Sequence, residues 1–186
     1  MNRTVLFVLG ALAVSAVASA QTPPASSDAL EKALSAAPRN MKDGATVIKW
    51  KADNTYDTLK KGTNKLVCYD RSGDPGQQPF AVQCTSIANL DRVAQNRKFE
   101  AMADKAARQA AIDAAEKDGT RVKPEFGSVW LTLSGADKDH ATHIHTTIAV
   151  PGATTQSMGL PSDNKQGGVW IMNAGTTTAH LMTPGS

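Results

Sequence analysis

The sequence predicts an α+β fold, in which antiparallel strands combine with one long alanine-rich helix. Short β-branched and aromatic stretches lie on both sides of a central segment, residues 89–117, where alanines recur at helical spacing. Strands and helices do not alternate along the chain, which disfavours the doubly wound sheet of nucleotide-binding domains. We therefore expect a single α+β domain over residues 45–186.

The first twenty residues have the pattern of a secretory signal peptide. Arg3 precedes an apolar run over residues 5–17, and the small residues that end at Ala20 offer a cleavage site. We expect cleavage near Ala20, then a flexible leader and a short helix within residues 21–44. No later segment reaches the roughly 20 apolar residues of a spanning helix, so the mature form should have no membrane span. The predicted location is periplasmic or secreted.

Three stretches before the central segment are predicted as strands, at residues 46–50, 65–69 and 80–84, because they are rich in β-branched and aromatic residues. Between the last two, residues 70–79 are dense in Gly, Pro, Asp and Ser, which predicts a loop.

Residues 89–117 predict the long helix, since apolar residues recur at threes and fours and no proline interrupts them. Gly119 offers a stop. The charged face of this helix is expected to be solvated surface, so we assign no partner to its basic residues.

After the helix, four further strands are predicted, at residues 128–133, 143–150, 169–172 and 179–182. A loop rich in Gly, Pro, Ser and Asn separates the second of these from the third.

The chain has two cysteines, Cys68 and Cys84. An even, sparse count in an oxidising compartment most simply means one structural disulfide, which would tie two predicted strands into a hairpin. The alternative is a redox-active pair, although no Cys-x-x-Cys arrangement is present to lower a thiol pKa.

The C-terminal region contains Gly167-Gly168-Val169-Trp170-Ile171-Met172, then Gly175-Thr176, then Ala179-His180-Leu181-Met182. This run resembles the C-terminal signature of a family of uncharacterised exported bacterial proteins. The resemblance covers about residues 58–184 and implies no activity. The family more often has Met at the position of His145, Pro at Thr177 and an aromatic residue at Thr178, so a role of His145 would be particular to this chain or close relatives.

Three of the four histidines fall within six residues, at His140, His143 and His145, and the fourth is His180. On a strand, His143 and His145 share one face and stand about 6.6 Å apart, a spacing that suits one metal ion. His180 and Met182 share a face in the same way. If the two strands pair, three imidazoles and a thioether favour copper, and zinc would be satisfied by the histidines with Asp139. The alternative is that these histidines are an ordinary surface pair and that Met182 fills the core.

Composition and motifs exclude several classes. The net charge of +3 is spread along the chain, so no nucleic-acid partner is expected. Gly-x-Ser-x-Gly, His-Glu-x-x-His and the phosphate-binding glycine loops are absent from the sequence. Trp50, Trp130 and Trp170 lie in predicted strands, where a large ring most often packs in the core but could line a ligand groove.

The sequence thus predicts an exported, non-enzymatic protein. It either binds a small ligand, a metal ion such as copper or zinc, or an envelope protein, or it supports the structure of the envelope. The alternative is an envelope hydrolase in which His180 or His143 acts as general base. Ser157 and Asp163 are the nucleophile and acid that can be named for such a site, but no pattern links them to a histidine.

Overall fold

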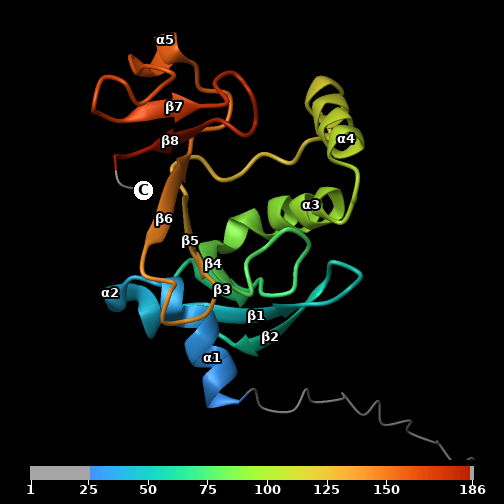
Figure 1. Ribbon diagram of the computed structural model, residues 1–186, viewed down its shortest axis with the longest axis vertical. Helices are drawn as coiled ribbons and strands as arrows, with labels where there is room; N and C mark the ends of the chain where they lie inside the picture. The colour runs from blue at the N-terminus through green and yellow to red at the C-terminus, as the bar shows by residue number, and fades with distance from the viewer. Residues whose placement is uncertain (1–25, 185–186) are drawn as a thin grey trace, which may run out of the picture.

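The computed structural model describes residues 26–184, and the predicted signal peptide lies outside this range. Within it the chain forms one mixed eight-stranded sheet and five α-helices (Figure 1). The α-helices are α1 (Ser27–Ala33), α2 (Arg39–Lys42), α3 (Leu90–Glu100), α4 (Lys105–Lys117) and α5 (Thr155–Met158). The strands are β1 (Thr46–Trp50), β2 (Tyr56–Lys60), β3 (Leu66–Asp70), β4 (Phe80–Ser86), β5 (Val129–Gly135), β6 (Ile144–Ala149), β7 (Trp170–Met172) and β8 (His180–Met182). None of the helices in the described range is long and apolar enough to cross a bilayer.

The strand order is β2-β1-β3-β4-β5-β6-β8-β7. Every neighbouring pair is antiparallel except β1 and β3, which run parallel. This pair departs from the antiparallel sheet that the sequence predicts. Its cause is β2, an additional strand that returns along the outer side of β1, so that the chain must cross to the inner side before β3 begins.

The single long helix predicted over residues 89–117 is two helices in the structure, with a break between Glu100 and Lys105. Asp104 caps the second helix, because its side chain accepts a hydrogen bond of 2.8 Å from the backbone N–H of Ala107. Such a cap satisfies a backbone donor that would otherwise be unpaired at a helix start. Alanines continue through the break, which is why spacing alone predicts one helix.

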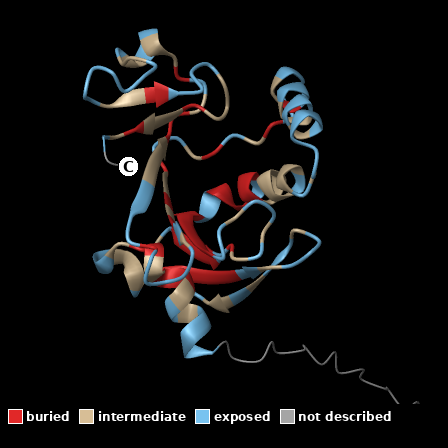
Figure 2. Cartoon of the chain, viewed as in Figure 1, coloured by how far each residue is buried: buried red, intermediate tan, exposed pale blue. Residues whose placement is uncertain are grey.

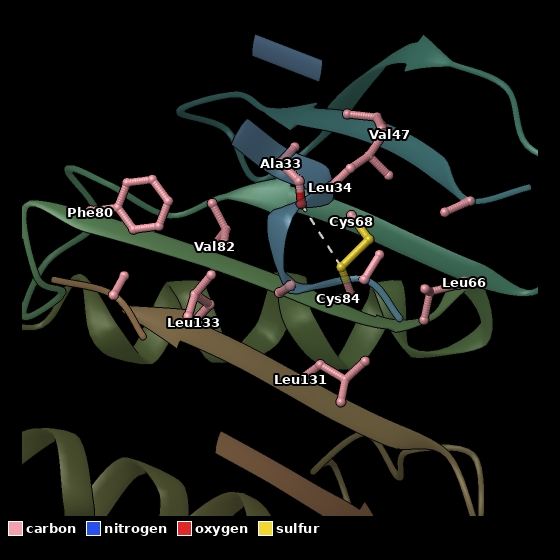
Figure 3. Packing of buried hydrophobic residues seen from close by; sticks show 14 residues of the cluster. Ala33, Leu34, Val47, Leu66, Cys68, Phe80, Val82, Cys84, Leu131 and Leu133 are labelled. Atoms are coloured by element: carbon pink, nitrogen blue, oxygen red, sulfur yellow. Dashed lines mark hydrogen bonds between the residues drawn. A yellow bond between two sulfur atoms is a disulfide. The ribbon is translucent and has the colours of Figure 1, made fainter. Parts of the chain in front are cut away.

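One face of the sheet packs against α1 and the 3-10 turn that follows it, Leu34–Ala36. Ala33 and Leu34 contribute to this core, so the short helix predicted within the leader is part of the packed structure. Figure 3 shows the Cys68–Cys84 disulfide within this cluster, next to the end of α1. The two cysteines are directly opposite in the β3–β4 ladder, with Cα atoms 4.1 Å apart, which confirms the predicted disulfide.

The opposite face of the sheet packs against α3, where Leu90 and Val93 meet the buried side chains of Val67 and Tyr69. Buried residues concentrate in β3, β4 and the start of α3, whereas α4 is largely exposed and buries only Ala115 (Figure 2). The packing therefore anchors α3 firmly and leaves α4 held mainly by polar contacts at its C-terminal end.

Four charged side chains fix the loop between β3 and β4 onto α3. The Asp74 carboxylate accepts hydrogen bonds from Arg71 Nε at 3.3 Å and Arg97 Nη1 at 2.6 Å, and Arg71 Nη2 donates to Glu100 at 2.5 Å. All four are well shielded from solvent, since the most exposed, Glu100, shows 27% of its side-chain surface. This set of two cations and two anions is called the loop network below.

Burial raises the pKa of the Glu100 carboxyl above its ordinary value, although the Arg71 guanidinium acts in the opposite direction. A carboxyl whose pKa is higher in the folded than in the unfolded chain stabilises the fold most when it is protonated. We therefore expect the free energy of unfolding of the wild type to rise relative to that of a Glu100→Gln variant as the pH falls from about 7 to about 4. Urea unfolding of both proteins across this range tests it, and a difference that is constant or shrinks with acidification would contradict the raised pKa.

Candidate functional site

A pocket of about 130 Å³ opens between α3 and the face of β5, β6 and β8 that carries Trp130. Its volume is similar to the roughly 150 Å³ of a protein cavity that holds one benzene. Both polar side chains and apolar side chains line this pocket. The polar lining includes Arg92, Asn96, Thr147 and His180, and the apolar lining includes Pro124, Trp130, Ala149 and Ala179. A few polar groups against an apolar wall are the usual composition of a small-molecule site.

The β-sheet register explains how residues so far apart in sequence meet. Trp130 is directly opposite Thr147, and Thr147 is directly opposite Met182, so these three side chains lie on one face of the sheet. His180 is opposite Ala149 on the same face. This is the face that α3 covers, and α3 brings Arg92 over it.

Arg92 is the most unusual residue of the pocket, because only 3% of its surface is exposed. Its guanidinium donates to the backbone oxygen of Val122 at 2.5 Å and to the hydroxyls of Thr177 and Thr178 at 2.8 and 2.7 Å. All three acceptors are neutral. Arginine is almost never this buried unless a carboxylate or another anion is its partner. Burial, helped by the nearby Arg121, lowers the pKa of Arg92 to about 10.

Glu116 on α4 is the carboxylate that comes nearest to serving as a counter-ion for Arg92. It accepts hydrogen bonds from the hydroxyl of Thr177 at 2.5 Å and that of Thr178 at 3.4 Å, so the two hydroxyls bridge it to Arg92. Burial alone would raise the pKa of Glu116, but the bonds from Thr177 and Thr178 and the charge of Arg92 lower it. The carboxylate therefore stays ionised. The bridge also ties α3 and α4 to the segment that leads into β8.

His180 is oriented by the backbone two residues before it. Its Nδ1 lies 2.8 Å from the carbonyl oxygen of Thr178. A carbonyl oxygen can only accept, so Nδ1 carries the proton, and in the neutral ring Nε2 is an acceptor. Half-buried at the pocket wall, His180 thus offers this nitrogen to a ligand.

Of the predicted metal ligands, His145 lies in β6 and His180 and Met182 lie in β8. These strands do pair and the register puts the three side chains on one face, whereas His143 precedes β6. These side chains are nevertheless spread along the length of the strands. His180 is opposite Ala149, four residues from His145, which is about 13 Å of strand. Met182 is buried, whereas His143 and His145 are exposed. The described part of the chain contains no group of three His, Cys, Asp or Glu residues close enough to hold a metal ion.

Metal binding by His143 and His145 alone remains a prediction, and the register indicates which substitutions should affect it. We expect Cu²⁺ and Zn²⁺ to bind a His180→Ala variant with the affinity of the wild type, because an ion held by His145 is too far from His180. Calorimetric titration of the two proteins, beside a His143→Ala/His145→Ala double variant, is the measurement. A tenfold loss of affinity in His180→Ala would mean that the ion does reach His180.

The residues named for a hydrolase are not assembled around His180. At the start of α5, the hydroxyl of Ser157 accepts a hydrogen bond from the backbone N–H of Thr154 and donates one to the Thr154 carbonyl oxygen. The Asp163 carboxylate accepts a hydrogen bond from the backbone N–H of Lys165. The two hydroxyls that precede His180, those of Thr177 and Thr178, are engaged with Arg92 and Glu116. The structure therefore does not bring Ser157 or Asp163 together with His180 in the way that a hydrolase would require.

A second hollow, of about 280 Å³, lies beside Trp50 and is lined by Asp70, Asp74 and Arg97 among others. Its two carboxylates are already paired, since Asp74 pairs with Arg97 at 2.6 Å and Asp70 with Lys32 at 2.7 Å. The pocket at Arg92 is smaller but holds a buried cation whose charge is not directly paired. This difference makes it the better candidate.

The sequence reasoning found His180 but missed Arg92, because it treated every basic residue of the central segment as solvated. The structure corrects this interpretation: Arg92 is buried and bonded, and only 15% of the Arg97 side chain is exposed. A signal was available for Arg97, which follows Leu90 and Val93 at the spacing of the apolar stripe. Arg92 lies outside that stripe, and its burial depends on contacts with residues 177 and 178.

No family model matches the chain, and no match to it is found among the curated proteins or the solved structures. The resemblance to exported bacterial proteins therefore stays a prediction.

Proposed function

We propose that this chain is an exported binding protein that holds a small ligand in the pocket between α3 and β8. The observation that carries the proposal is the buried Arg92 guanidinium at the pocket wall, hydrogen-bonded to neutral oxygens only. A buried cation without a direct counter-ion is costly to the fold, and proteins keep such groups mainly where they serve a function. His180 and Trp130 add a polar acceptor and an aromatic wall to the same pocket.

Export is supported by two independent features. The N-terminal residues have the pattern of a secretory signal peptide. The fully buried disulfide between Cys68 and Cys84 is of the kind that forms and persists in oxidising compartments. We infer that the protein acts in the periplasm or outside the cell, where a ligand-binding protein meets molecules before they enter the cytoplasm.

The binding proposal is tested by NMR titration of the protein with a panel of small acids, amides and alcohols, each added alone. We expect backbone amide shifts confined to the pocket, at Thr147, Ala149, Thr178 and His180, together with a shift of the Trp130 indole N–H. Shifts that gather instead around Trp50, or no shifts with any probe, would contradict the proposal.

Two variants on neighbouring positions of β6 provide the matched control. Thr147→Phe adds a ring into the pocket and should abolish the shifts by filling the space. Thr146 is the adjacent residue on the opposite face, paired with Leu131, so Thr146→Phe should leave ligand binding unchanged. Equal loss of binding in both variants would indicate a general disturbance of the strand and would refute the assignment of the site to this face.

A further inference from the structure

The charged residues around the pocket indicate the sign of the charge that its ligand carries. Arg121, 6% exposed, lies near Arg92 and binds the side-chain oxygens of Gln95 and Asn96 at 2.7 and 2.6 Å. Neither Arg92 nor Arg121 forms a salt bridge with a carboxylate of the described chain. Glu116 influences both guanidiniums but reaches Arg92 only through hydroxyls, and Glu100, which also acts on Arg121, is already paired with Arg71. Neither carboxylate contacts Arg92, so a ligand with one negative charge would give this buried cation a direct partner.

Arg92 also has hydrogen-bonding capacity left for such a ligand. A guanidinium carries five N–H donors, and the bonds to Val122, Thr177 and Thr178 use three of them. Two donors remain without a partner among the described residues. A carboxylate is the group whose geometry matches two guanidinium N–H donors, and charge-assisted bonds of this kind are about twice as strong as neutral ones.

His180 limits the ligand further. Because Nδ1–H is committed to the Thr178 carbonyl, the neutral ring presents a lone pair at Nε2. A ligand with acceptors alone would face this lone pair with an oxygen of its own, which is repulsive. A ligand that carries an O–H beside its carboxylate satisfies both residues at once.

Size and the apolar wall select among such ligands. The space of about 130 Å³ suits a compact molecule, and Trp130, Pro124 and Ala149 offer contact to carbon rather than to further oxygens. Hydrogen phosphate also combines a negative charge with an O–H, but it would leave this wall without an apolar partner.

We propose, building on the proposed binding function, that the ligand is a small hydroxycarboxylate whose carboxylate is bound by Arg92 and whose hydroxyl donates to Nε2 of His180. The deprotonated acid gives the buried Arg92 a direct counter-ion, its hydroxyl meets the one acceptor that the imidazole presents, and its carbon chain packs against Trp130.

The test compares four probes of similar size on the wild-type protein by NMR titration: lactate, propionate, lactamide and inorganic phosphate. Propionate keeps the charge and lacks the hydroxyl, whereas lactamide keeps the hydroxyl and lacks the charge. We expect propionate and lactamide each to bind roughly tenfold more weakly than lactate, the usual loss for one hydrogen bond to a buried or charged partner. This comparison needs no variant and so does not depend on the folding of one.

The outcomes separate the two proposals. If none of the four probes, and no other acid, amide or alcohol, shifts the pocket resonances, the binding function fails. If lactate and lactamide bind with equal affinity, the pocket binds ligands, but the proposed role of the carboxylate charge is overturned. If lactate and propionate bind with equal affinity, the proposed role of the hydroxyl is overturned. Phosphate binding tighter than lactate would overturn the hydroxycarboxylate in favour of an inorganic anion.

One variant assigns the hydroxyl to its acceptor. His180→Ala should lower the affinity for lactate to the level of propionate and leave propionate itself unchanged. A parallel loss for both probes would show that His180 acts on the pocket in some other way and would contradict the assignment of Nε2.

Discussion

Replacing both cysteines, Cys68→Ala with Cys84→Ala, is expected to lower the free energy of unfolding by about 3 kcal/mol. The bridge closes a segment with a sequence separation of 16 residues, and removing it restores conformational freedom mainly to the unfolded chain. Both residues, Cys68 in β3 and Cys84 in β4, are fully buried in the cluster that includes Ala33, so the truncation also removes packed atoms from the core (Figure 3). Urea unfolding of the double variant and the oxidised wild type measures the difference.

Reductant supplies the control for this prediction. Adding a thiol reductant should move the unfolding midpoint of the wild type toward that of the double variant and should leave the double variant itself unchanged. If reduced and oxidised wild type unfold at the same urea concentration, the bridge does not stabilise the fold in the manner described.

The second large effect is expected at the centre of the loop network. Asp74→Ala leaves the guanidiniums of Arg71 and Arg97 without their shared carboxylate, in a region where both side chains are at most 15% exposed. Breaking a buried ion pair by removing one partner commonly costs 3–5 kcal/mol, so we expect a loss of about 3 kcal/mol in the free energy of unfolding. Faster amide hydrogen exchange in residues 71–79 should accompany it, because the loop loses its attachment to α3.

Asp163→Ala is the matched control for Asp74→Ala. Asp163 also faces a cation, Lys165, but the two atoms are 3.8 Å apart and both side chains are at least half exposed. An exposed pair of this kind contributes little, and the control should unfold like the wild type. Equal stability losses in the two variants would rule out burial as the source of the effect at Asp74.

Much of the fold was predictable because short strands leave a clear local signal. The stretches at 46–50, 80–84 and 128–133 agree with β1, β4 and β5 to within two residues at either end. The strand β2 was missed, since Tyr56–Lys60 mixes charged and apolar residues and is half exposed at the sheet edge. The parallel pairing of β1 with β3 follows from that strand and so was missed with it.

The candidate site was less predictable, because it depends on register and on contacts distant in sequence. Periodicity predicts that His143 and His145 share a face of one strand and that His180 and Met182 share a face of another, but it cannot tell which residues of two strands stand opposite each other. The observed pairing of His180 with Ala149 moves it away from His145 and toward Trp130. Arg92 depends on Thr177 and Thr178, which are 85 and 86 residues further along the chain.

The position of β8 has a consequence for how the molecule is made. β8 lies between β6 and β7, so β7 is made before the strand that connects it to the rest of the sheet. Until residue 182 has been synthesised, β6 exposes an open edge, and an unpaired edge is the part of a nascent chain most prone to join another molecule. The same strand completes the wall of the ligand pocket. The sheet and the ligand pocket should therefore be completed in the same step. This step cannot precede the release of β8 from the ribosome or the export channel.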